Sequence, residues 1–500
     1  MKKILLFAAL CLPALLKANN LQISNLAVSL PNVSFTIQWD NSWNTTNNIN
    51  PLYPNNWDGV WVFVKYQNNI DNLWKHATLS ATAADHSVSG GVLEVNTVSD
   101  GMGVFVRRSA PGAGSISATT VTLKMNSLTG SGDFNFRVFG TEMVYMPSGV
   151  FQLGDGNVSG ANYFTPVTVD AASQTSGIAA GALYSGSPAV PAAFPTGFNA
   201  AYLMKYELTN EQWVDFMNTL TYDQQANRMD IAPNGSVGTL AYSAGGYATF
   251  SVADNVIKIK TSGFNNTRPV ILGCDLNNNT VFGENGDGQN MAISVLSKGD
   301  LLAYMDWSGL RPMTELEFEK ACRGTLNRVA GEYAWGSTAL SYKYRSNLSN
   351  KGMAEEAFAG TITDGQCMGY AYYAGGENNT GPARSGVFAS GSSGRASSGA
   401  GFYGAMELSG NALELAVQVD AKGVLFTNKN GNGQLTASGD SDVQSWPLPN
   451  DNANPSGMHW RGGEFYYYIP GYFTTSYRAY GYAGSTRYFL NGGRGIRTAP

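Results

Sequence analysis

The segment 460–497 constrains the fold more than any other part of the chain, because it combines many aromatic residues with many glycines. Its aromatic density far exceeds the 12% of the whole chain, at positions Trp460, Phe465, Tyr466, Tyr467, Tyr468, Tyr472, Phe473, Tyr477, Tyr480, Tyr482, Tyr488 and Phe489. A buried strand would carry Val, Ile and Leu with a period of two. Two interpretations follow: an exposed binding surface, where tyrosine gives a large contact area at low entropic cost, or a tyrosine-rich strand pair in the core.

Length and charge narrow the class of protein. A chain of 500 residues suffices for two to four domains with sizeable cores. Charged residues make up 13% of the chain and its net charge is −5, which argues against nucleic acid as a partner because phosphate binding needs a basic surface. Short segments bounded by Gly, Asn, Ser and Thr predict a β-rich, loop-rich protein.

The first residues predict the compartment. Lys2 and Lys3 precede an apolar run, 4–16, that is too short to span a bilayer, and the small Ala18 fits a cleavage site. We therefore expect residues 1–18 to be a cleaved signal peptide and the mature protein to be secreted or displayed on the outer cell surface. No later run is apolar enough to predict a membrane span.

The cysteines leave two alternatives open. The predicted mature chain keeps three of them, Cys274, Cys322 and Cys367. An odd number excludes a fully paired disulfide framework. One disulfide with a free thiol, or three buried thiols, are both compatible with the sequence.

Residues 19–140 have the alternating pattern of a small antiparallel β-sandwich. The expected strands are 33–39, 60–66, 103–107, 119–125 and 134–139. Tryptophans in this part allow either a carbohydrate-binding face or a core and interface role: Trp39, Trp43, Trp57, Trp61 and Trp74.

Residues 141–500 form the second predicted unit, with an insertion at 221–290 that is β-rich over 221–273. We expect a helix over 206–220, with Thr209 as its N-cap and Gln212 completing a capping box. A short helix is expected over 300–307. Thr314 should cap another helix, with Glu317 at the capping-box position three residues later.

An Asn-rich loop predicts a calcium site. Asp275, Asn277 and Asn279 place oxygen ligands at alternate positions, as a tight loop around a hard cation requires. The loop departs from the EF-hand pattern, with Thr280 at its sixth position and Gly286 at its twelfth. The alternative is a loop built from Asx turns without a metal. A weaker repeat of the pattern follows at 428–440.

Seven motifs occur in one order along the second unit: MPSGVF (146–151), YELTNEQW (206–213), LRPMTELEFEKA (310–321), YAWG (333–336), GNALEL (410–415), WRGG (460–463) and GIR (495–497). In these motifs, residues 141–500 resemble the formylglycine-generating enzyme, or sulfatase-modifying factor, family. The resemblance implies an irregular C-type-lectin-like α+β domain after the β-sandwich. It also implies a calcium site at Glu407, Gly410, Ala412 and Glu414, although Glu407 and Leu413 replace the residues usual in the family.

The family's chemistry does not carry over. The resemblance implies a copper ion held by two cysteines shortly after the RGG motif, and thiolate pairs suit Cu(I). Residues 464–478 contain no cysteine. Iron-dependent relatives use several histidines, whereas this chain has three, His76, His86 and His459. We therefore predict a protein that is not an enzyme.

The end of the chain also resembles the variable proteins of diversity-generating retroelements, which randomise a segment before a terminal GxR-type motif. The sequence thus predicts a secreted or surface binding protein for an unidentified protein or glycan. Alternatives are a self-assembling structural protein and a metal-dependent oxidase of the family. Arg461, Arg478, Arg494 and Arg497 are expected to hold the scaffold. The predicted ligand-binding residues are Tyr466, Tyr467, Tyr468, Tyr472, Phe473, Tyr480, Tyr482, Arg487, Tyr488 and Phe489.

Overall fold

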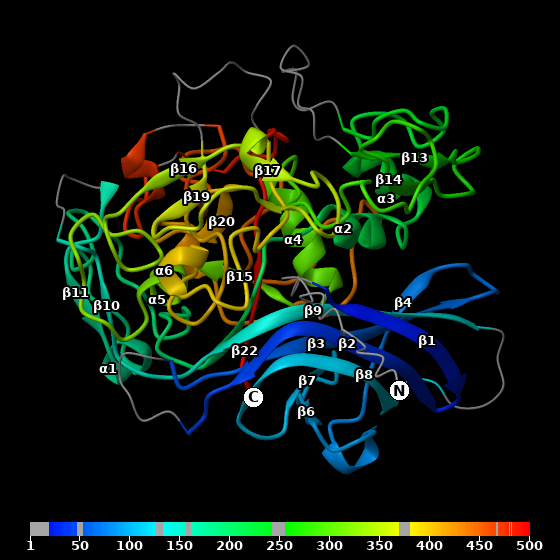
Figure 1. Ribbon diagram of the computed structural model, residues 1–500, viewed down its shortest axis with the longest axis horizontal. Helices are drawn as coiled ribbons and strands as arrows, with labels where there is room; N and C mark the ends of the chain where they lie inside the picture. Colours follow the sequence, from blue (N-terminus) through cyan, green and yellow to red (C-terminus); the bar gives the residue numbers. More distant parts are fainter. Residues whose placement is uncertain are drawn as a thin grey trace, which may run out of the picture.

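A computed structural model gives the fold (Figure 1). It describes residues 20–47, 54–126, 128, 134–156, 162–242, 256–369, 381–466, 469–479, 481 and 483–500. The predicted signal peptide, residues 1–18, lies outside the described residues.

The protein is mostly β, with short helices. The strands are β1 (Gln22–Ser29), β2 (Asn32–Asn44), β3 (Asp58–Asn68), β4 (Trp74–Ala77), β5 (Ser87–Val88), β6 (Leu93–Thr97), β7 (Val104–Arg108), β8 (Gly112–Lys124), β9 (Phe134–Met146), β10 (Phe151–Leu153), β11 (Val167–Val169), β12 (Ala201–Met204), β13 (Ile257–Thr261), β14 (Ile271–Cys274), β15 (Arg311–Thr314), β16 (Ser341–Lys343), β17 (Leu348–Ser349), β18 (Ala357–Phe358), β19 (Gln366–Met368), β20 (Glu414–Val417), β21 (Met458–Arg461) and β22 (Gly495–Thr498). The helices are α1 (Ala171–Thr175), α2 (Asn210–Met217), α3 (Tyr222–Arg228), α4 (Lys298–Trp307), α5 (Glu315–Arg323) and α6 (Arg395–Ser398).

One sheet runs through both halves of the chain. Its strand order is β21-β20-β15-β22-β12-β9-β3-β7-β6, with β4 paired to β3. Strand β9 pairs with β3 on one side and with β12 on the other, and all of these pairings are antiparallel. The predicted boundary at residues 140 and 141 therefore falls within a continuous strand.

A second sheet covers the N-terminal part of the first. Its order is β1-β2-β8-β5. Along β2, buried and less buried residues alternate as the period of two predicts. Side chains of β2 and β8 share one hydrophobic cluster with β3 and β7, including Phe35, Trp39, Val62, Val104 and Val121.

The helices begin where capping signals predict. Thr209 caps α2 and Thr314 caps α5, each within a capping box, so both predictions are confirmed. Helix α4 begins at Lys298, two residues before the predicted start, because Ser297 caps it. The region 221–273, for which the sequence predicts mainly strands, opens with helix α3, because Thr221 caps a helix there. Among the described residues, no helix combines the length and apolar character that crossing a membrane requires.

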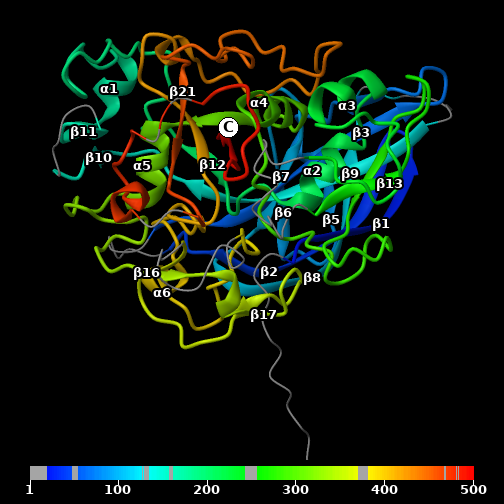
Figure 2. The ribbon, with the colours of Figure 1, turned by 90° about the horizontal axis from the view of Figure 1, so that it is seen from above.

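The second half is irregular outside the shared sheet. Viewed from above, α1, β10 and β11 lie at one end of the molecule, while α3 and β13 lie at the other (Figure 2). One hydrophobic cluster joins the sheet to β10, β11 and β13, and another packs α5 against the sheet. The C-terminal strand β22 lies between β15 and β12 in the sheet, which buries Gly495, Ile496 and Arg497.

Candidate functional site

The terminal segment, residues 460–497, is anchored to helix α5 by buried ion pairs. Arg461 donates to Glu315 Oε2 and Glu319 Oε1, both at 3.3 Å, and Arg478 Nη2 lies 2.8 Å from Glu315 Oε1. All four side chains are almost fully buried. Burial alone would raise the pKa of Glu315, but Arg478 and His459 hold that pKa well below its usual range.

Two further arginines fix the end of the segment. Arg494 Nε lies 2.8 and 2.9 Å from the two carboxylate oxygens of Glu414, and its guanidinium also donates to the carbonyls of Met204 and Lys205. Arg497 lies 4.3 Å above the ring of Trp61 and donates to Asp100 at 2.6 Å. The prediction that the four arginines hold the scaffold is confirmed.

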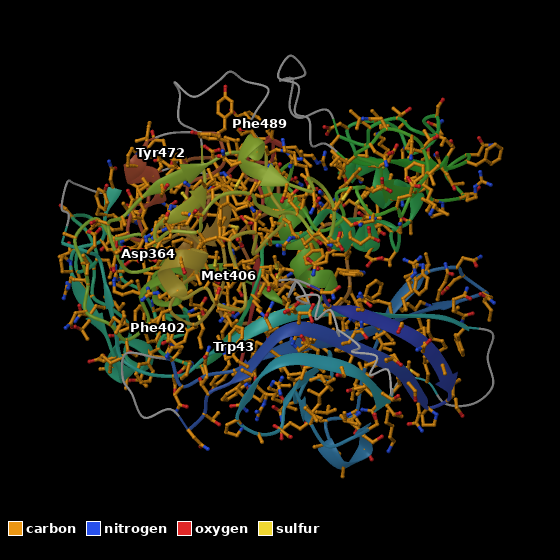
Figure 3. All side chains as sticks on the ribbon, viewed as in Figure 1. Trp43, Asp364, Phe402, Met406, Tyr472 and Phe489 are labelled. Carbon is orange, nitrogen blue, oxygen red and sulfur yellow. The ribbon has the colours of Figure 1, made fainter. Side chains whose placement is uncertain are left out.

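The aromatic residues of this segment divide into buried and half-exposed groups. Phe473 is 0% exposed and Phe489 is 3% exposed, so their assignment to a binding surface is wrong. Phe473 packs against Tyr333, Trp335 and Cys367, because burying its apolar ring breaks no hydrogen bond with water. Figure 3 places Tyr472 and Phe489 near one edge of the molecule.

Three predicted tyrosines remain candidates for ligand contact: Tyr466, Tyr472 and Tyr488 are half-buried. Their rings pack edge-on or tilted against neighbours. Tyr466 and Tyr488 lie 5.3 and 4.8 Å from the buried ring of Phe489, and Tyr472 lies 5.1 Å from Tyr477. Four further predicted positions, Tyr467, Tyr468, Tyr480 and Tyr482, lie outside the described residues.

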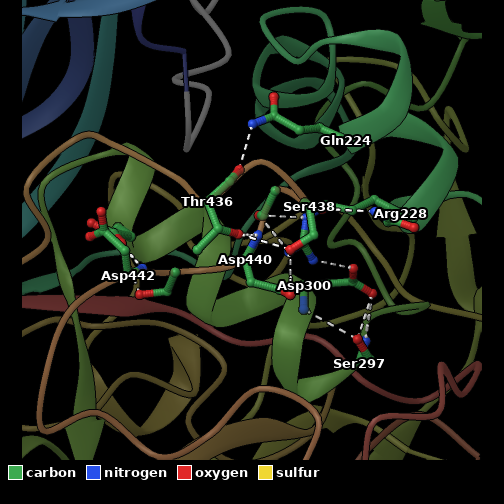
Figure 4. A network of polar contacts seen from close by, with 12 residues as sticks. Gln224, Arg228, Ser297, Asp300, Thr436, Ser438, Asp440 and Asp442 are labelled. Carbon is green, nitrogen blue, oxygen red and sulfur yellow. Dashed lines mark hydrogen bonds and ion pairs between the residues drawn. The ribbon is translucent and has the colours of Figure 1, made fainter. Parts of the chain in front are cut away.

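Arg487 belongs to a structural network instead of a free surface. Its Nε lies 2.8 Å from Asp300 Oδ2 and its Nη1 lies 3.0 Å from Asp230. Asp300 also binds Arg228, which in turn binds Asp440 at 2.8 Å (Figure 4). The network joins the N-terminus of α4 to α3 and to the loop around residue 440. The expectation that Arg487 contacts a ligand is therefore corrected: its guanidinium holds helices together.

The turn implied to bind calcium has other partners. Both oxygens of Glu414 bind Arg494. Glu407 Oε1 accepts from the Gly386 amide at 2.7 Å, and the Ala412 amide donates to Glu207. Burial raises the pKa of Glu407 to about 7. Calcium at Glu407, Gly410, Ala412 and Glu414 stays a prediction, and this donor set fits it poorly because Arg494 already neutralises Glu414.

The Asn-rich loop is organised around a lysine. Lys258 Nζ lies 2.9 Å from Asp275 Oδ2 and 2.6 Å from Asn278 Oδ1. The side-chain amides of Asn277 and Asn279 donate to Glu284 instead of converging with Asp275. Backbone amides complete Asx turns on Asn277 and Asn279, and the Asn279 amide also donates to Asp275. Calcium binding at this loop stays a prediction, and the ammonium of Lys258 already lies beside Asp275, the one carboxylate among the expected ligands.

The three cysteines are free and buried, which settles the open alternative in favour of separate thiols. They lie apart, on β14, on α5 and on β19. Burial raises the pKa of Cys322 to about 12, so this thiol stays protonated at neutral pH. Within the part of the chain that the structure describes, no group of three His, Cys, Asp or Glu side chains is placed to hold a metal ion.

Sequence reasoning missed a group of carboxylates around a cavity between α2 and β9. They are Glu142, Glu207, Glu211 and Asp215. The spacing of Glu211 and Asp215, four residues apart on one helix, placed them on one face. The positions of Glu142 and Glu207 depend on strand pairing between β9 and β12, which the sequence alone did not predict.

Comparison with known proteins assigns the family. Residues 140–498 match the model of the sulfatase-modifying factor enzyme 1-like domain, and the match covers more than half of the chain. No curated protein matches the sequence. The ordered motifs and the match agree on the same part of the chain, and the protein therefore belongs to the formylglycine-generating enzyme, or sulfatase-modifying factor, family.

Proposed function

We propose that this protein is a non-catalytic, secreted or surface-displayed binding protein of the family, which presents the tyrosines of its terminal segment to a protein or glycan. The observation that carries the proposal is the arrangement of that segment. Buried pairs of Arg461 and Arg478 with α5 hold its backbone, while Tyr472 and Tyr488 stay half-exposed. A rigid base under partly exposed tyrosines suits binding, because little side-chain entropy is lost on contact.

The sequence supports the non-catalytic part of the proposal. The copper chemistry implied by the family resemblance needs a thiolate pair soon after the RGG motif, and residues 464–478 contain no cysteine. Burial also raises the pKa of Cys322 to about 12, which disfavours its thiolate.

Three finer points belong to the same proposal. Residues 1–18 direct export, and the sheet β1-β2-β8-β5 forms a β-sandwich module with the N-terminal strands of the large sheet. The terminal segment is the diversified region of a retroelement variable protein. This last point rests on the abundance of Tyr, Ser, Thr and Gly just before the terminal GIR motif.

The test compares ligand capture by single variants of the mature chain. Tyr472→Ala and Tyr488→Ala should abolish capture of a glycan or host surface protein that the wild type retains, while melting temperature stays nearly unchanged. Tyr66→Ala, a half-buried tyrosine on β3, is the matched control. Unchanged capture by both variants would refute the proposal, and so would copper-dependent oxidation of a cysteine peptide.

A size measurement and a comparison of loci separate the remaining alternatives. A self-assembling structural protein would form large, concentration-dependent oligomers, whereas a binding protein should remain a defined small species. Sequences of the same locus from sister cells should differ mainly within 464–491 if the segment is diversified. Differences scattered evenly along the chain would count against diversification.

A further inference from the structure

A cavity of about 240 Å³ opens between the two halves of the molecule. Its walls come from α2 and α4 on one side and from β9, β3 and the start of β1 on the other. Figure 1 shows these elements meeting at the centre of the molecule. No described residue of the terminal segment lines the cavity, so it is separate from the proposed tyrosine surface.

The charged lining is entirely negative. Its acidic lining residues are Glu142, Glu207, Glu211 and Asp215, of which Glu207 accepts hydrogen bonds from Asn411 and the Ala412 amide, and among the described lining residues there is no lysine, arginine or histidine. Glu211 and Asp215 project from one face of α2. Glu142 comes from β9 and Glu207 from the segment between β12 and α2.

The compensation of these charges is incomplete. Lys205 Nζ lies 3.0 Å from Glu142 Oε2 but also 3.1 Å from Asp58, so one ammonium serves two buried carboxylates. Glu142 is 4% exposed, and its Oε1 atom has no hydrogen-bond partner among the described residues. A buried carboxylate oxygen without a donor is costly, and a bound donor would relieve this cost.

The pKa of Asp215 is also shifted by its surroundings. Burial, followed by the charge of Glu211, raises the pKa of Asp215 to about 7. Burial likewise raises the pKa of Glu142. Burial is the largest cause in both cases; Glu211 adds to it at Asp215 and Asp58 at Glu142, while Arg137 and Lys205 act in the opposite direction. Carboxylates with such raised pKa values in cavities frequently mark binding sites.

The cavity also has an aromatic lining, which comes from β3 and from α4. Phe63, Tyr304 and Trp307 line it, with the rings of Phe63 and Trp307 5.1 Å apart and those of Tyr304 and Trp307 5.6 Å apart. Lys65 Nζ lies 5.1 Å from the centroid of Trp307, so this ring already attracts an ammonium. The cavity therefore combines carboxylates with a surface suited to an apolar stem.

This lining distinguishes an organic cation from a metal ion. The described His, Cys, Asp and Glu side chains nowhere converge in a group of three that could hold a metal. A point-like ion would need such convergence, whereas a chain with an ammonium at its end needs one carboxylate and apolar contact along the stem. We propose that the cavity binds a small primary amine or diamine with an aliphatic stem.

The test is titration of the mature, full-length chain with putrescine and n-butylamine, followed by calorimetry, with 1-butanol as the neutral control. The wild type should bind both amines saturably and 1-butanol not at all. Asp215→Asn should weaken amine binding about ten- to hundredfold, as expected for the loss of one charge-assisted hydrogen bond. Asp223→Asn, an exposed carboxylate on α3, is the matched control and should bind like the wild type.

A second readout separates binding from folding. Asp215→Asn should melt no lower than the wild type in the absence of amine, because the change removes a poorly compensated charge. Absence of saturable amine binding, or equal affinity of the wild type and Asp215→Asn, would overturn the proposal. Calcium binding that Asp215→Asn abolishes would overturn it in favour of a metal site.

Discussion

The ion pair between Arg494 and Glu414 gives the sharpest prediction about stability. Both side chains are 0% exposed, and two hydrogen bonds of 2.8 and 2.9 Å join Arg494 Nε to the carboxylate. Arg494→Met keeps most of the side-chain volume but leaves Glu414 buried without a counter-charge. Breaking one member of a buried pair typically lowers the free energy of unfolding by about 3–5 kcal/mol.

The loss of unfolding free energy in Arg494→Met should increase as the pH rises. Burial raises the pKa of Glu414, and Arg494 lowers it, so removing Arg494 raises it further. The unfolded pKa of a glutamate is about 4.3. A carboxyl whose folded pKa lies above this unfolded pKa stabilises the folded state at pH values below the unfolded pKa, and this stabilisation is lost as the pH rises through the folded pKa. Arg494→Met should therefore be only mildly destabilised relative to the wild type at pH 4.5 and fully destabilised at pH 8.

Chemical denaturation at both pH values measures the effect. The double variant Arg494→Met/Glu414→Leu should recover most of the stability, because no charge is then left unpaired. Lys75→Met, which breaks the exposed pair with Asp71, is the control and should change stability far less. A loss below about 1 kcal/mol for Arg494→Met at pH 8, or a double variant as unstable as the single one, would refute the reasoning.

Three further predictions concern other parts of the chain. Phe473→Ala should cost about 3–5 kcal/mol of unfolding free energy because the ring is fully buried, whereas Tyr472→Ala beside it should cost clearly less; equal losses in urea denaturation would contradict the burial pattern. The three thiols should resist alkylation in the native protein and react together on unfolding, as counted by mass spectrometry; labelling of the native protein would contradict their burial. Since the folded pKa of Asp215 is raised to about 7, its protonated form stabilises the protein at low pH and that stabilisation is lost as pH rises toward 7, so Asp215→Asn should gain melting temperature over the wild type at pH 8 but not at pH 4.

Local signals predicted local structure well. The capping boxes at Thr209 and Thr314 located the starts of α2 and α5, because the hydrogen bonds that begin a helix involve residues three apart in sequence. The segments 33–39 and 60–66 located β2 and β3, because successive side chains of a strand point to opposite faces. Burial alternates along β2, whereas residues 58–65 of β3 are all buried. The family motifs likewise identified the part of the chain that matches the family model.

Features decided by distant partners were not predictable. Phe473 is buried because Tyr333, Trp335 and Cys367 come from other segments to cover it. Asp275 meets Lys258, which approaches from the neighbouring strand β13, so a pattern compatible with calcium is held by an ammonium. The sequence predicts that Arg487 lies on the surface, whereas in the structure it forms an ion pair with Asp300 of α4.

The course of β9 has a practical consequence for anyone dissecting the molecule. Its residues pair with β3 from Phe134 to Val144 and with β12 from Met143 to Met146. A fragment beginning at residue 141 would therefore lack most of that ladder and expose bare backbone donors and acceptors to other chains. Expression of residues 141–500 alone should therefore give aggregates. Transfer of this half to another protein during evolution would require either the whole of β9 with its partner β3 or another segment that pairs with the exposed edge of β9.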